Sequence, residues 1–194
     1  MADIIEKPSP NFDERGGVSP SMILLHYTGM PTAQDALERL TDAESKVSAH
    51  YTIDEDGTVY RHVEEDKRAW HAGDSFWRGT KNINAHSIGI EIVNPGHEWG
   101  YCEFPSSQIS RVMELCSAIK KRHEIEYVLG HSDVAPARKE DPGELFPWKL
   151  LAQNGIGVWP EISDEDMVKA GGMDVVLALG DYGYDISQPD KAIL

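Results

Sequence analysis

Basic residues and cysteines are scarce in this chain of 194 residues. Lysine and arginine together number 18, against 33 aspartates and glutamates, so the formal net charge at pH 7 is −15. Nucleic-acid binding draws much of its affinity from lysine and arginine at the phosphates, so this charge excludes a nucleic-acid partner. The two cysteines, Cys102 and Cys116, are too few for a disulfide framework. A chain of this length can instead bury one compact apolar core, with a short appendage.

Long apolar segments are also lacking. No stretch approaches the roughly 20 apolar residues that cross a bilayer, so the sequence predicts no transmembrane helix. Residues 1–8 lack the basic start and apolar centre of a secretory signal. The sequence as written therefore predicts a cytoplasmic protein. The alternative is the periplasm or the cell envelope, if a targeting segment has been removed.

Short apolar runs alternate with two amphipathic helical patterns, which predicts a mixed α/β domain. The first helix is expected to follow Thr32, which can act as its N-cap. The longest helix is expected to begin at Ser106 or Ser107, and it ends in a basic run that suits the helix dipole. A hairpin is predicted between residues 47–53 and 58–63, because an Asp-Gly turn joins them. The helices should cover the sheet that carries the functional site.

The most informative stretch covers residues 130–143, where a histidine, a lysine and an aspartate lie close together. His131 directly follows a short apolar run, as does a ligand displayed at the edge of a sheet. Lys139 and Asp141 are two residues apart, so their side chains leave the same side of an extended segment. The carboxylate can then bind a divalent cation while the lysine points at an oxygen that the cation polarises.

A catalytic zinc site needs about three protein ligands and one open position. His26 is the best candidate for the third ligand, because it ends the apolar run 22–25 and precedes a Gly-Met-Pro sequence that breaks the strand. Two histidines and a carboxylate form a set of nitrogen and oxygen donors that zinc accepts. The chain has eight histidines, however, and a hydrogen-bonded structural role for His26 or His131 stays open from spacing alone.

Glu91 interrupts the apolar strand expected over residues 87–94. A buried carboxylate is costly unless it is paired, linked to a metal or protonated. Burial also raises its pKa toward the range useful for a general base. The alternative is an ordinary ion pair with a neighbouring strand, and Lys139 can likewise be a plain surface cation.

Six ordered blocks together resemble the zinc-dependent N-acetylmuramoyl-L-alanine amidases, the type 2 amidase family. That family includes phage lysozyme-type amidases and shares its fold, a mixed sheet flanked by helices, with peptidoglycan recognition proteins. The blocks are residues 24–28, 48–54, 69–73, 87–91, 130–133 and 139–143. Residues 145–148 and 155–160 are similar to the branch with a broad-specificity bacterial envelope amidase, rather than to the small cytosolic recycling amidase.

The resemblance implies one Zn²⁺ per chain, held by His26, His131 and Asp141. It also implies a water activated by zinc as the nucleophile, Glu91 as general base and acid, and Lys139 as the group that stabilises the oxyanion. The implied reaction hydrolyses the amide between N-acetylmuramic acid, in its ordinary or 1,6-anhydro form, and L-alanine of peptidoglycan stem peptides or muropeptides. Peptidoglycan fragments are thus the implied partners, and no protein partner is readable from the sequence.

Two other classes of function stay open. A peptidoglycan-recognition module would bind without turnover, which the complete set of implied ligands disfavours. A zinc peptidase that cuts within the stem peptide would share the metal site but release fragments of different mass.

The same blocks contain candidates for substrate contacts, which are Tyr51, Trp70, His71, Asn94 and Arg138. Trp70 can stack on a sugar face or pack in the core, and Tyr51 can approach the activated water or pack in the sheet. Asn94 precedes a Pro-Gly pair, so a turn explains it equally well. Four further histidines show no partner pattern and are expected to be structural or at the surface: His62, His86, His97 and His123.

The composition changes beyond Pro160, where residues 161–194 hold eight acids against two lysines. We therefore expect a zinc amidase domain over residues 1–160 and a short acidic helical extension over 161–194. Ser163 resembles a helix cap, and a second short helix is expected from Asp174. The resemblance implies that this extension is a truncated peptidoglycan-binding module.

Overall fold

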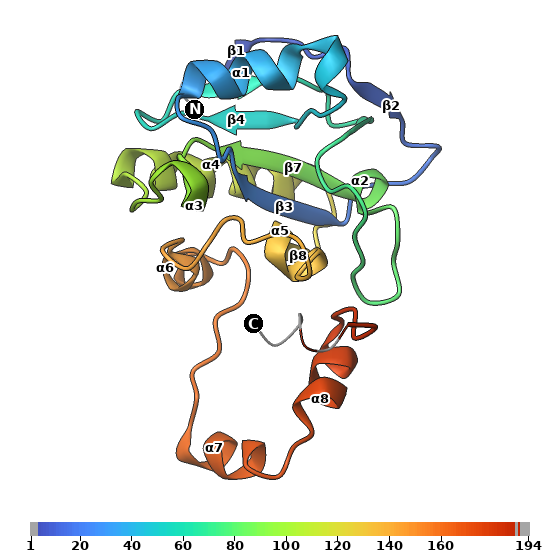
Figure 1. Cartoon of the computed structure of the whole chain (residues 1–194), viewed down its shortest axis with the longest axis vertical. Coiled ribbons are helices and arrows are strands. Elements are labelled where there is room, and N and C mark those ends of the chain that lie inside the picture. The colour runs from blue at the N-terminus through green and yellow to red at the C-terminus, as the bar shows by residue number, and fades with distance from the viewer. Residues whose placement is uncertain (1–3, 189, 191–194) are drawn as a thin grey trace.

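The computed structural model describes residues 4–188 and residue 190, and its centre is one mixed β-sheet (Figure 1). The sheet has six strands in the order β1-β5-β4-β7-β3-β8. These strands are β1 (Ile4–Glu6), β3 (Met22–Tyr27), β4 (Tyr51–Ile53), β5 (Val59–Arg61), β7 (Ser87–Ile92) and β8 (Tyr127–Gly130). A separate antiparallel pair consists of β2 (Phe12–Glu14) and β6 (Lys67–Ala69).

Helices lie on the sheet and beyond it. They are α1 (Ala33–Thr41), the 3₁₀ turn η1 (Ala43–Ser45), α2 (Ile83–His86), α3 (Gly96–Trp99), α4 (Ser106–Arg122), α5 (His131–Val134), α6 (Trp148–Gln153), α7 (Asp164–Ala170) and α8 (Val175–Tyr182). The predicted mixed α/β class is confirmed. Across the described residues, no helix is both long and apolar enough for a membrane span.

Four neighbouring strands of the sheet, β4, β7, β3 and β8, run parallel, so their carboxyl ends share one edge. The register sets His26 opposite Glu91, and Glu91 opposite Thr52. Leu25 lies opposite Gly130, which brings the next residue, His131, beside His26. Residues far apart in the sequence therefore meet at this edge.

The two faces of the sheet bury different clusters. Alternate residues of β3, β4 and β7 pack under α4 and α6; this cluster includes Ile23, Leu25, Ile53, Ile90, Val112, Cys116 and Leu151. The opposite face carries Met22 and Leu24, which contact Trp77, Ile83 and Val134. Since side chains alternate along a strand, His26 lies on this second face with Leu24, and Glu91 lies there as well.

The local predictions agree with the observed elements. Thr32 caps α1 by accepting a hydrogen bond from the backbone N–H of Asp35 at 3.1 Å, and α4 begins at Ser106. The predicted hairpin is confirmed, with β4 and β5 antiparallel, but its first strand starts only at Tyr51. Ser48, within the range predicted for that strand, bonds elsewhere, because its N–H donates to the carbonyl of Trp70 at 3.0 Å.

The C-terminal extension leaves the body of the fold and then returns to it (Figure 1). Ser163 caps α7 as predicted, and neither α7 nor α8 contains a buried residue. After α8 the chain contacts the body again: the N–H of Arg78 donates to Gly183 at 2.9 Å, and the Tyr184 hydroxyl donates to Asp133 Oδ1 at 2.7 Å. Asp133 lies on α5, so the extension is attached beside the helix that begins with His131.

Candidate metal centre and active site

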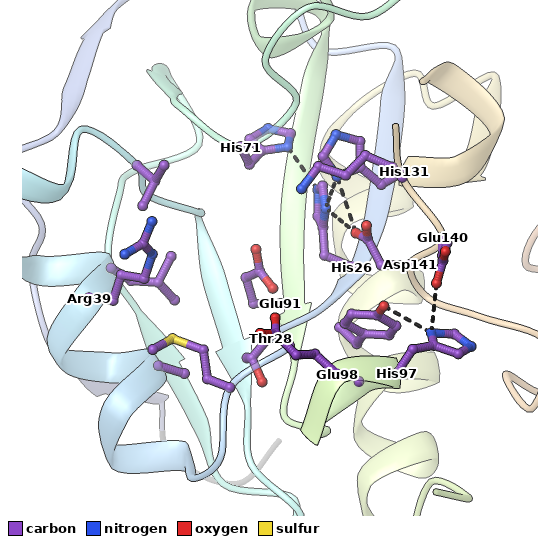
Figure 2. A pocket seen from close by; sticks show the side chains of 18 of the residues that line it. His26, Thr28, Arg39, His71, Glu91, His97, Glu98, His131, Glu140 and Asp141 are labelled. Carbon is purple, nitrogen blue, oxygen red and sulfur yellow. Dashed lines mark hydrogen bonds and ion pairs between the residues drawn. The ribbon is translucent and has the colours of Figure 1, made fainter. Parts of the chain in front are cut away.

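Three side chains from different segments converge at the edge where the parallel strands end (Figure 2). His26 comes from β3, His131 from the start of α5, and Asp141 from the loop that follows. Nδ1 of His26 lies 3.0 Å from Nδ1 of His131 and 2.9 Å from Oδ2 of Asp141. The third edge of this triangle, from His131 Nδ1 to Asp141 Oδ2, is 3.1 Å, and all three residues are buried.

The donor atoms of this triangle fit a cation. Nε2 of His131 lies 2.9 Å from the backbone carbonyl of Ala72, so Nε2 donates to that carbonyl and Nδ1 is the nitrogen that faces the triangle. Burial, and then the nearby His131, lower the pKa of His26 to about 4, so this ring is neutral. Burial would raise the pKa of Asp141, but its contacts with the two histidines outweigh burial and lower it. Histidine binds metals through a neutral imidazole and aspartate through its carboxylate, so this set of donors suits a metal ion.

The triangle lies in a cavity of about 380 Å³, a volume within the range of small-ligand sites. Figure 2 shows Glu91 pointing into this cavity, with Arg39 of α1 on the far wall. Sequence reasoning missed Arg39, because α1 was recognised only by its apolar face. The cavity therefore joins the strand edge to one helix of the body.

Glu91 has a buried carboxylate oxygen, Oε2, for which the described residues provide no hydrogen-bond partner. Burial, and then the negative charge of Asp141, raise the pKa of Glu91 well above its usual range. Within the described part of the chain, no lysine or arginine forms an ion pair with Glu91. The ion pair with a neighbouring strand, which was the alternative expected from the sequence, is therefore not found among these residues. Such a group can take up a proton inside the cavity.

Lys139 and Arg138 both line the cavity, but they differ in their partners. The Arg138 guanidinium donates to the carbonyls of Ala72 and Asp74, so it holds that loop. The backbone N–H of Lys139 donates to Ala135 at 3.1 Å, which fixes where its side chain starts. Among the described residues, no carboxylate lies within ion-pair distance of the Lys139 amine.

His71 lines the cavity, and its ring lies against a metal-ligand candidate. Its Nδ1 is 3.0 Å from Nε2 of His26. Burial, followed by the neighbouring His26, lowers the pKa of His71 well below its usual value, so its ring is neutral. Nδ1 of His71 is thus already engaged with His26.

Tyr51 does not reach the cavity, which corrects one expected substrate contact. It pairs with Ile90, which faces α4, so its side chain leaves the opposite face of the sheet from the metal-ligand candidates. Its hydroxyl donates to Glu65 Oε1 at 2.8 Å, and Glu65 also bonds to Arg122 and His123. Burial would raise the pKa of Glu65, but these hydrogen bonds outweigh burial and lower the pKa to about 2.

Asn94 is also corrected, whereas Trp70 lies where it was expected. The Asn94 side chain donates to the carbonyl of Cys102 at 2.8 Å and accepts from the N–H of Gly96 at 3.0 Å, so it is the turn residue of the alternative interpretation. Trp70 lines the cavity, and its indole N–H donates to Asp13 at 2.7 Å. That bond fixes the orientation of the ring at the cavity wall.

His97 is exposed, as expected, and it also lines the cavity. Its Nδ1 lies 3.2 Å from Oε2 of Glu140 (Figure 2) and 3.0 Å from the Tyr27 hydroxyl. Its Nε2 lies 3.0 Å from Glu144, and its ring stacks on Tyr101. His97 lines the cavity because α3 follows β7 at the same edge of the sheet as Glu91. Sequence spacing alone did not reveal this placement.

Comparisons with known proteins identify the family of the chain. Residues 16–144 match the sequence profile of the N-acetylmuramoyl-L-alanine amidase family. The chain is 35% identical to the N-acetylmuramoyl-L-alanine amidase AmiD of Escherichia coli (strain K12), over 96% of this chain and 76% of AmiD. It is 29% identical to the 1,6-anhydro-N-acetylmuramyl-L-alanine amidase AmpD of Haemophilus influenzae, over 77% of this chain and 90% of AmpD.

A solved structure gives the same result for the fold. The complex of E. coli AmiD with anhydro-N-acetylmuramic acid-L-Ala-D-gamma-Glu-L-Lys matches with a TM-score of 0.76 at 35% identity, covering 89% of this chain and 76% of that one. The chain belongs to the N-acetylmuramoyl-L-alanine amidase family. The resemblance read from the sequence blocks is therefore confirmed.

Proposed function

We propose that this protein hydrolyses the amide bond between N-acetylmuramic acid and L-alanine in muropeptides, with one Zn²⁺ per chain. The observation that carries the proposal is the triangle of His26, His131 and Asp141, whose donor atoms lie about 3 Å apart in one cavity with Glu91 and Lys139. Membership of the amidase family gives the reaction class.

His26, His131 and Asp141 would hold the zinc ion through two imidazole nitrogens and one carboxylate oxygen. Three protein ligands leave a coordination position free, as in other catalytic zinc sites. When bound, zinc supplies a Lewis acid for the amide carbonyl and lowers the pKa of water toward about 7.

Glu91 acts as general base and then as general acid. Its unpartnered Oε2 and raised pKa favour uptake of a proton from the attacking water. The same carboxyl then delivers the proton to the departing amine of L-alanine. Lys139 lines the cavity, and no carboxylate of the described residues pairs with its amine, so it can stabilise the negative charge that develops on the carbonyl oxygen.

Substrate contacts come from the cavity walls. The indole of Trp70 offers a fixed apolar surface for a sugar ring. Arg39 and Arg138 provide positive charge for the carboxylates of the lactyl-peptide chain, which the net negative charge of the protein would otherwise repel. Peptidoglycan fragments with ordinary or 1,6-anhydro sugars are the proposed substrate class, and AmiD bound to an anhydromuramyl peptide supports this choice.

Mass spectrometry of a defined muropeptide incubated with zinc-loaded protein tests the proposal. We expect two products, the muramic acid sugar and a peptide that begins with L-alanine, and we expect a chelator to stop their release until zinc is restored. Zinc binding without products would identify a recognition module. Cleavage between two amino acids of the stem would identify a peptidase.

Two further expectations stay proposals. We propose that residues 161–188 form a helical extension that is attached to the catalytic domain through Gly183 and Tyr184, and limited proteolysis would test this arrangement. Of the extension expected over 161–194, residues 189 and 191–194 lie outside the described part of the chain. A cytoplasmic location remains a prediction, which fractionation of cells that express the chain would test.

A further inference from the structure

The outward-facing nitrogens of both histidine ligands contact two consecutive residues. Nε2 of His131 lies 2.9 Å from the carbonyl oxygen of Ala72, and Nε2 of His26 lies 3.0 Å from Nδ1 of His71. Figure 2 shows the ring of His71 beside the two ligands, on the side away from Asp141. We call residues 71 and 72 the orienting pair. One short segment thus reaches both imidazoles from behind.

The hydrogen bonds around His71 determine which ring nitrogen of His71 and of His26 carries the proton. The Ser87 hydroxyl donates to the carbonyl of Ile83 at 2.7 Å, so its oxygen can only accept from the His71 Nε2 that lies 3.4 Å away. His71 therefore carries its proton on Nε2 and accepts at Nδ1. The Nε2 of His26 must then be the donor, which leaves the Nδ1 lone pair of His26 facing the triangle.

The orienting pair is itself held by one side chain. Oδ1 of Asn84, on α2, accepts the backbone N–H of His71 at 3.0 Å and that of Ala72 at 2.7 Å. Asn84 is buried, so this oxygen has little competition from water. The missing side chain of Gly89 makes room for the ring, since a Cβ there would lie 2.5 Å from Cγ of His71.

We propose that the orienting pair sets the tautomer and the direction of both histidine ligands, with Asn84 as its anchor. His71 is then a positioning residue for the metal centre and not a substrate contact, which revises the expectation from the sequence. Outer partners of this kind raise ligand basicity and fix ring orientation. The inference rests on the proposed function, because it assumes that His26 and His131 bind the metal.

Substitutions at His71 separate orientation from packing. We expect His71→Ala to weaken zinc binding by about 10-fold to 100-fold, measured by competition with a chelator. His71→Asn should stay within a few-fold of the wild type, because the amide oxygen of asparagine can take the place of Nδ1 as acceptor. His86→Asn is the matched control, since His86 is a histidine of α2 that does not line the cavity.

Substitutions at Asn84 test the anchor in the same way. Asn84→Ala removes the acceptor of both N–H groups and should weaken zinc binding, whereas Asn84→Asp keeps an acceptor oxygen and should retain it. Nitrogen NMR of the wild-type imidazoles gives a readout that needs no variant. In the zinc-loaded protein, His71 is expected to carry its proton on Nε2.

Each contrary outcome has a distinct meaning. If His71→Ala binds zinc like the wild type and only the KM for the muropeptide rises, His71 is a substrate contact and the inference is wrong. Equal losses for His71→Ala and His71→Asn, or a proton on Nδ1 of His71, would also overturn it. A wild-type protein that neither binds zinc nor cleaves the muropeptide would instead defeat the proposed function.

Discussion

Replacing Gly89 by alanine perturbs the metal centre without removing any polar group. The added Cβ would lie 2.5 Å from Cγ and 2.6 Å from Nδ1 of His71. Ordinary carbon contacts begin near 3.5 Å, so the ring must retreat by about 1 Å. The bond from Nε2 of His26, now 3.0 Å, would then exceed hydrogen-bonding distance. We expect zinc affinity to fall by about 10-fold to 100-fold, and overpacking to lower the free energy of unfolding by about 1–3 kcal/mol.

Chelator competition and chemical denaturation measure these two quantities on the same samples. Gly172→Ala is the control, because a Cβ there meets nothing closer than a carbonyl at 3.9 Å in the exposed extension. Combining Gly89→Ala with His71→Ala should restore part of the unfolding free energy, since the clash is gone, while zinc affinity stays as low as in His71→Ala alone. A folded Gly89→Ala protein that binds zinc as tightly as the wild type would refute the reasoning.

Four other outcomes follow from the described contacts. Glu91→Gln should lower kcat by about 10²-fold to 10⁴-fold while the zinc content stays unchanged, as steady-state kinetics and metal analysis would reveal. Lys139→Ala should lower kcat by about 10²-fold to 10³-fold with a smaller change in KM, and a larger effect on KM would contradict its assigned role. Glu65→Gln should cost about 3 kcal/mol of unfolding free energy at pH 7. Because the folded pKa of Glu65 is about 2, this difference should shrink as pH falls from about 4.5 toward 2, and a difference that is constant with pH would count against it. Tyr184→Phe should cost about 1 kcal/mol through the bond lost to Asp133 and speed proteolysis of the extension, whereas an unchanged cleavage rate would argue against the attachment.

Local patterns in the sequence predicted most of the fold. Apolar periodicity and the Thr32 cap located α1 and α4, and an Asp-Gly turn located the hairpin of β4 and β5. His26 and His131 were recognisable because each follows an apolar run, and Asp141 because it lies two residues after Lys139 in the same short stretch as His131. Parallel strands then bring such strand ends to one edge, which is why the triangle could be anticipated before its distances were known.

The residues that sequence reasoning placed wrongly, or did not connect with the site, depend on long-range geometry. The face of Tyr51 could not be read, because β4 is only three residues long and the residues before it do not pair as a regular strand. His97 carries no motif, and only the fold brings it beside Tyr27. The role of Asn84 could not be predicted either, because a single buried oxygen that accepts two backbone N–H groups produces no periodic pattern in the sequence.

The burial of the metal triangle has a consequence for the cohesion of the whole chain. Cys102 and Cys116 are both free, so no covalent bridge ties distant parts of the described polypeptide together. An ion shared by His26 and His131 would act as such a bridge, because it joins positions 105 residues apart. Native-state binding of this kind adds to the unfolding free energy in proportion to the logarithm of the free metal concentration, well above the dissociation constant. The melting temperature of the protein would then report on the zinc supply around it.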